Sequence, residues 1–228
     1  MTGRLLRTVA TGLYHAGLTG VLSTASGYLR RAPAFSVFTY HRVNDHHDPF
    51  FEALPVDVFD RQMRLIARHY VALPVEELVD RLRAGTVPRN AVAITFDDGY
   101  RDLLTHAAPI LARYHLPATV FLATGFIGSG ETPWYDRLAT ALKCTSAPRV
   151  AIPFSDEQLP LDSREARLRA LGRLQAHWKS LPEVDARKAL DGLLENLGAG
   201  DHDYRKNAFL RWDDVHALRG LGFRIGAH

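Results

Sequence analysis

The sequence predicts an α/β fold built mostly on parallel strands. Runs rich in β-branched and aromatic residues alternate along the chain with segments whose apolar residues recur at helical spacing. One run, Ala91–Phe96, is almost continuously apolar, as expected of a strand buried on both faces of a parallel sheet. With 228 residues, 46% of them hydrophobic and 23% charged, the chain can also bury a sizeable core.

The first half of the chain should supply most of the sheet. Strands are expected at residues 35–41, 70–73, 91–96 and 118–123. Each is separated from the next by a polar loop or a helical pattern, which is the rhythm of parallel strands joined by crossovers.

Three helices are expected between these strands. Asp57 can cap the first, and Pro74 opens the second, which Gly85 closes. The third should run over residues 102–114, with Pro109 bending it.

The pattern changes in the second half. Residues 133–207 look helical only, with pieces near 134–143, 165–180 and 184–197, and we interpret about 133–210 as a helical insertion. A helix over 212–219 and a fifth strand over 223–227 then resume the alternation.

The N-terminal segment, residues 1–34, is predicted to be a basic leader that precedes the folded domain, residues 35–228. It contains four arginines and no acidic residue, so it could contact an anionic membrane surface. Its uncharged stretch is diluted by glycines and hydroxyl residues, which makes it a poor membrane span and a poor secretory signal. We therefore expect a cytoplasmic or peripheral membrane protein rather than a secreted one.

The net charge and the cysteine content exclude few classes of partner or compartment. The net charge of +3 is only mildly basic, and we expect no nucleic-acid partner. The single cysteine, Cys144, rules out an intramolecular disulfide and fits a reducing compartment. Nothing in the sequence predicts the oligomeric state.

The most specific motif is a pair of carboxylates, Asp97 and Asp98, directly after the buried strand. Two like charges this close resist joint ionisation unless they share a cation or a proton. A metal ion would resolve the conflict by binding one Asp and leaving the other free to take a proton from water. The simpler interpretation is an ordinary Asp-Gly turn, in which Gly99 lets the chain leave the strand.

A second candidate, His228, follows the predicted fifth strand. The carboxyl ends of parallel strands are where catalytic residues gather in barrels, and a neutral imidazole is a good ligand for zinc. By itself this residue is better interpreted as a surface histidine at the end of the sequence.

Together these motifs resemble the polysaccharide deacetylase family, the NodB-homology domains of carbohydrate esterase family 4. Residues 95–99 match the family's first motif, Thr-Phe-Asp-Asp-Gly, and His228 matches the first His of its second motif, His-Ser/Thr-x-x-His. Shorter stretches resemble a bacterial subgroup from exopolysaccharide gene clusters, at 40–43, 126–128, 134–138 and 212–213. The resemblance covers about residues 35–228 and implies a partial, distorted (β/α) barrel.

The resemblance also implies roles for individual residues. Asp97 would be the general base, and Asp98 and His228 would hold a divalent metal ion, usually zinc in this family. The implied reaction is hydrolysis of N-acetyl groups on a hexosamine-containing poly- or oligosaccharide. His41, Gly99 and Tyr100 are the further residues expected to line the site.

The family pattern is incomplete here. The second histidine of the second motif would lie four residues beyond His228, and the family's later motifs are also missing, so we expect a fragment or a truncated product. Two other functions stay open: a non-catalytic product, and a metal-dependent amidase that acts on a small amide. Removal of acetyl from oxygen is also possible, because the same base and metal could serve an ester.

Weaker candidates have simpler explanations. His46, His47 and Asp48 could bind a metal but read better as a solvated loop. Trp134 and Tyr135 could stack on a sugar ring, although the core side of a helix is the better interpretation.

Overall fold

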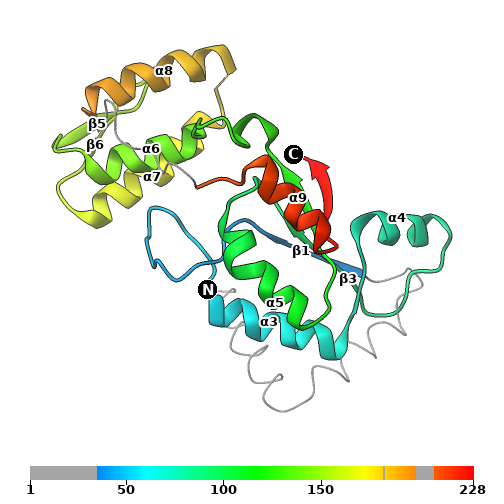
Figure 1. Ribbon diagram of the computed structural model, residues 1–228. Coiled ribbons are helices and arrows are strands. Elements are labelled where there is room, and N and C mark those ends of the chain that lie inside the picture. Colours follow the sequence, from blue (N-terminus) through cyan, green and yellow to red (C-terminus); the bar gives the residue numbers. More distant parts are fainter. Residues whose placement is uncertain (1–34, 182, 199–207) are drawn as a thin grey trace, which may run out of the picture.

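The computed structural model describes residues 35–181, 183–198 and 208–228, so the expected basic leader lies outside the described residues. Its centre is a five-stranded parallel sheet with the order β1-β3-β4-β7, in which β2 also pairs with β3. The strands are β1 (Phe35–Tyr40), β2 (Val71–Ala72), β3 (Ala91–Phe96), β4 (Thr119–Leu122) and β7 (Arg224–Ala227). This arrangement confirms the α/β class with parallel strands (Figure 1).

The central strand is β3, and all six of its residues are buried. It pairs along its full length with β1, while its first residues pair with β2 and its last with β4. Its continuous apolar run is therefore explained by burial on both faces of the sheet. By contrast, β1 and β7 each pair with one strand of the described part; β1 is largely exposed, and β7 is half exposed and half partly buried.

The main core lies between the sheet and helices α3 (Val56–His69), α5 (Ala108–Arg113) and α9 (Trp212–Gly220). In α3 the apolar residues recur at helical spacing, and Phe59, Met63 and Ile66 are all buried, as the sequence predicts. Helix α4 (Val75–Arg83) covers a smaller cluster around Leu78 and Ala93.

The helix expected over residues 102–114 is irregular at its start. It begins as a π-helical turn, η1 (Leu103–Ala107), and continues as α5. Pro109 lies at the junction, where its missing N–H removes a donor from the regular helical ladder.

Residues between β4 and α9 form a second core. Helices α6 (Trp134–Cys144), α7 (Arg164–Trp178) and α8 (Glu183–Asn196) pack around Leu138, Leu142 and Leu174. Figure 1 shows these helices gathered together beside the sheet rather than on it.

The expectation that residues 133–207 are helical only was wrong. Two short strands, β5 (Arg149–Ala151) and β6 (Gln158–Pro160), form an antiparallel hairpin. Val150 and Leu161 of this hairpin are buried against the helices. Each strand has only three residues, which is too short for an alternating pattern to stand out in the sequence.

No helix in the described ranges is long and apolar enough to cross a membrane.

Candidate active site

The candidate site lies where the strands of the parallel sheet end. Asp97 follows β3 directly, and its N–H donates to the carbonyl of Tyr40 at the end of β1 (2.9 Å). The N–H of His228 donates to the carbonyl of Leu122 at the end of β4 (2.9 Å). Parallel pairing thus brings residues from distant parts of the sequence to one edge of the sheet, where open α/β sheets bind ligands.

The chain leaves β3 through a strained turn. The N–H of Gly99 donates to the carbonyl of Asp97 (2.9 Å), and Asp98 between them has φ of 69°. A three-residue turn with a positive φ at its centre is rare and costs conformational energy. Asp tolerates this backbone region better than most residues, and the turn holds the Asp98 carboxylate at the edge of the sheet.

Gly99 is required for two reasons. Its φ is 85°, and a Cβ added to it would lie 2.9 Å from side-chain atoms of both Leu122 and Ile127. The carbonyl of Gly99 also accepts from the N–H of Leu210 (2.9 Å). The glycine therefore allows the turn and the close approach of the loop after β4.

Asp98 and His228 are brought together as a pair. The Nε2 of His228 lies 3.4 Å from Oδ1 of Asp98, and the side chains are 49% and 13% exposed, respectively. Two ligands of one tetrahedral zinc ion lie roughly 3.3 Å apart when each is about 2.0–2.1 Å from the metal. One carboxylate oxygen and one imidazole nitrogen at this spacing fit part of a zinc coordination shell.

The Asp98–His228 pair would supply two protein ligands to a zinc ion. In the part of the chain that the structure describes, no group of three or more His, Cys, Asp or Glu side chains is placed to hold a metal. Catalytic zinc sites usually have three protein ligands and one open position.

Asp97 faces a different histidine. The Nε2 of His41, which follows β1, lies 4.0 Å from Oδ2 of Asp97, and the His41 side chain is 54% exposed. The two carboxylates of the motif therefore have different histidine neighbours: Asp98 faces His228, and Asp97 faces His41.

Tyr100 lies beneath the site rather than on its surface, with only 3% of it exposed. Its hydroxyl donates to Oδ2 of Asp136 on α6 (3.1 Å), and the guanidinium of Arg42 lies 4.4 Å from its ring centroid. Burial, followed by the nearby negative charge of Asp136, raises the pKa of Tyr100 well above its ordinary value. Tyr100 therefore connects the site to the α6–α8 helices as a neutral hydrogen-bond donor.

Tyr135 is the neighbour of Asp98 that the sequence does not predict. Burial raises the pKa of its hydroxyl above the ordinary value, with smaller contributions from the negative charge of Asp98 and a hydrogen bond to it. Periodicity assigns this residue to the core side of α6. Only the packing of α6 against the turn after β3 places its hydroxyl near a candidate metal ligand.

Two of the weaker candidates, Asp48 and Trp134, make contacts within the fold. Asp48 forms an ion pair with Lys143 (2.7 Å) and accepts from the N–H of Phe50, while His46 and His47 lie in the same loop. Trp134 packs against Trp178, with ring centroids 6.3 Å apart, at the edge of the second core.

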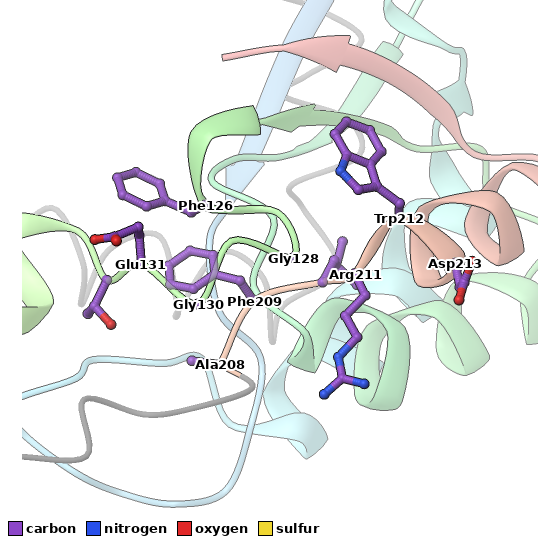
Figure 2. Close-up of a pocket in the computed structure, with 11 residues that line it drawn as sticks. Phe126, Gly128, Gly130, Glu131, Ala208, Phe209, Arg211, Trp212 and Asp213 are labelled. Atoms are coloured by element: carbon purple, nitrogen blue, oxygen red, sulfur yellow. The ribbon is translucent and has the colours of Figure 1, made fainter.

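A pocket of about 480 Å³ adjoins the turn after β3. The loop after β4 forms one side, and the segment that leads into α9 forms the other (Figure 2). This segment runs beside the turn, because Leu210 binds the Gly99 carbonyl and the Phe209 ring stacks on Tyr100 at a centroid distance of 4.5 Å.

Comparison with known proteins finds a family match over part of the chain. The model of the family described as polysaccharide deacetylase matches residues 84–152, which include the Asp97–Asp98 motif. A poly-β-1,6-N-acetyl-D-glucosamine N-deacetylase from Staphylococcus epidermidis is 36% identical over 72 residues, covering 31% of this chain and 25% of that protein. The protein of the same name from Staphylococcus aureus is 34% identical over 71 residues, covering 31% of this chain and 24% of the relative.

The chain thus spans about a quarter of the length of these curated relatives. Among solved structures, a de-N-acetylase from Aggregatibacter actinomycetemcomitans is 19% identical, with a TM-score of 0.44, over 85% of this chain and 54% of that one.

The family match and the curated relatives confirm the resemblance that the motifs suggest, including its exopolysaccharide subgroup. Over residues 84–152, the chain is similar to the polysaccharide deacetylase family.

Proposed function

We propose that this chain supplies catalytic residues of a metal-dependent hydrolase that removes N-acetyl groups from a β-1,6-linked N-acetylglucosamine polysaccharide. The reaction class and the polymer are supported by the names of the curated relatives. The observation that carries the proposal for this chain is the 3.4 Å approach of Asp98 and His228, beside a second carboxylate that faces elsewhere.

In this proposal Asp97 is the general base. Its carboxylate would take a proton from the attacking water, whose oxygen then adds to the acetyl carbonyl carbon. The C–N bond breaks, the amine nitrogen takes up a proton, and acetate leaves. Asp97 is suited to this role because its side chain is 18% exposed, so it is accessible to water.

Asp98 and His228 would hold the divalent ion, most commonly zinc. When bound, such an ion supplies a Lewis acid that stabilises negative charge on the acetyl oxygen. Tyr135 and the strained turn would fix the Asp98 carboxylate, as neighbours of metal ligands generally do.

The catalytic role is tested by Asp97→Asn. With a short β-1,6-linked N-acetylglucosamine oligomer and zinc, release of free amine should fall at least about 100-fold, the lower range for a general base. Asp156→Asn, at an exposed position between β5 and β6, is the matched control and should retain the wild-type rate. An Asp97→Asn variant with the wild-type rate would contradict the assigned base.

The metal role is tested separately by zinc titration. Asp98→Asn should weaken binding of zinc at least about tenfold, whereas Asp97→Asn should bind zinc nearly as well as the wild type. Asn tolerates the positive φ at position 98, so the backbone should be preserved. Equal affinity of all three proteins would exclude the Asp98–His228 pair as a metal site.

Assays with different substrates distinguish the functions that the sequence leaves open. Activity on small amides alone would support an amidase, and release of acetate from O-acetyl sugars alone would support an esterase. A chain that binds zinc but turns over none of these substrates would be non-catalytic by itself.

A further inference from the structure

The pocket beside the turn after β3 combines an exposed aromatic ring with carboxylate side chains. Trp212, the first residue of α9, is 50% exposed, which is unusual for a large aromatic side chain. Phe126 lies on the other side of the pocket, and Glu131 and Asp213 are also on its wall. Figure 2 shows Trp212 and Arg211 pointing to opposite sides of the segment that leads into α9.

The backbone around Trp212 is held firmly. The N–H of Gly128 donates to the carbonyl of Leu210 (3.2 Å), and the N–H of Leu210 donates to the carbonyl of Gly99 (2.9 Å). Gly128 has φ of 67°, and a Cβ added to it would lie 3.7 Å from Cδ1 of Trp212. The exposure of the indole is therefore a feature of an anchored segment and not of a loose loop.

The pocket lies next to the candidate active site. The pocket is built from the loop after β4 and from residues that hydrogen-bond to Gly99, the neighbour of Asp98. The N–H of Ala123, which begins the loop, donates to the carbonyl of Asp98 itself (3.3 Å). The pocket and the carboxylates therefore share one edge of the sheet.

The chemistry of the pocket fits a sugar ring. A pyranose has an apolar face of C–H bonds and a rim of hydroxyl groups, so it pairs with an aromatic face and with hydrogen-bond acceptors. The pocket volume of about 480 Å³ is within the range of small-molecule sites. Glu131 and Asp213 both line the pocket, and among the described residues their side chains have no hydrogen-bonding or ionic partner.

We propose that this pocket binds a hexosamine residue of the glycan that flanks the residue being deacetylated, with Trp212 stacking on the sugar and Glu131 accepting from its hydroxyl groups. The inference rests on the proposed function for its substrate class. It adds a binding site outside the Asp97–Asp98–His228 group. It predicts that the affinity of the protein for the glycan increases with oligomer length.

The test uses calorimetry to measure how tightly the full chain binds the monomer and the pentamer of β-1,6-linked N-acetylglucosamine. All proteins in the test carry Asp97→Asn, so that no turnover occurs. We expect the pentamer to bind at least about tenfold more tightly than the monomer. Trp212→Ala should remove most of that difference, and Trp212→Phe should retain part of it. Glu131→Gln should weaken pentamer binding severalfold and leave the monomer unaffected.

Phe154→Ala is the matched control, because Phe154 is 72% exposed and lies outside the pocket, in the turn between β5 and β6. The proposal is overturned if Trp212→Ala and wild type bind the pentamer equally, if Trp212→Ala weakens monomer and pentamer alike, or if neither sugar binds at millimolar concentration. Circular dichroism of each variant establishes that it is folded.

The two proposals fail in different ways. Length-dependent binding that depends on Trp212, without any deacetylation by the wild type, would leave the pocket assigned and refute the catalytic proposal. Deacetylation of the pentamer at the wild-type rate by Trp212→Ala would refute the pocket and leave catalysis intact.

Discussion

At the scale of single residues, the site depends on two consecutive positions with positive φ, Asp98 at 69° and Gly99 at 85°. The turn they form points one carboxylate of the motif at His228 and leaves the other facing His41. Backbone strain of this kind persists only where the surrounding structure stabilises it. Here the stabilisation comes from hydrogen bonds of the turn to Leu210 and Ala123.

Replacement of Gly99 by Ala should be strongly destabilising. The positive φ alone should cost about 1–3 kcal/mol, and the added Cβ would also press on Leu122 and Ile127 at 2.9 Å. Gly222→Ala is the matched control, because its φ is 91° but no atom lies within 4 Å of its would-be Cβ. Urea denaturation should show a larger loss for Gly99→Ala, and equal losses would mean that packing at position 99 contributes nothing.

At the scale of elements, the position of His228 depends on the pairing of β7 with β4. The register places Phe121 opposite Gly226, and a Cβ at Gly226 would lie 2.7 Å from the Phe121 ring. The ring therefore covers the glycine, and the small residue keeps the two strands in the register that brings His228 to the sheet edge.

The pair should show energetic coupling. Gly226→Ala should destabilise the protein by about 1–3 kcal/mol because it overpacks the strand pair. Phe121→Leu should relieve part of that loss, giving a coupling energy of at least about 0.5 kcal/mol in a double-mutant cycle. Additive losses in urea denaturation would contradict the contact, and zinc titration of Gly226→Ala would show whether His228 has moved.

At the scale of the whole molecule, two separate hydrophobic clusters support the site from different sides. One lies between the sheet and helices α3, α5 and α9, and the other lies among α6, α7 and α8. The hydrogen bond from Tyr100 to Asp136 joins the turn after β3 to the second cluster. The α6–α8 helices thus contribute to the site through Asp136 and Tyr135, although their core is distinct.

Truncations in the two clusters should therefore be independent. Leu111→Ala in the first cluster and Leu174→Ala in the second remove side chains that are 1% and 0% exposed. Each should cost about 2–5 kcal/mol, and the double variant should equal their sum within about 0.5 kcal/mol. Leu82→Ala, at a position 41% exposed, is the control and should cost far less. A coupling energy well above that limit in urea denaturation would show that the clusters act as one core.

The sequence by itself determined the alternation of strands and helices, the buried character of β3 and the place of Asp97 and Asp98 at its end. These features are local, because periodicity and turn residues act within a few positions of one another. It also identified His228 through its resemblance to a motif, but it could not show the distance to Asp98, which depends on how β7 pairs with β4.

Only the tertiary structure decided which residues surround the site. It buried Tyr100, brought Tyr135 to Asp98 and placed the exposed ring of Trp212 beside the turn, and it revealed the β5–β6 hairpin. None of these follows from local pattern, because each depends on the packing of segments that are distant in the sequence. Side-chain burial and hydrogen bonding across such segments are set by the fold as a whole, and a single sequence leaves them open.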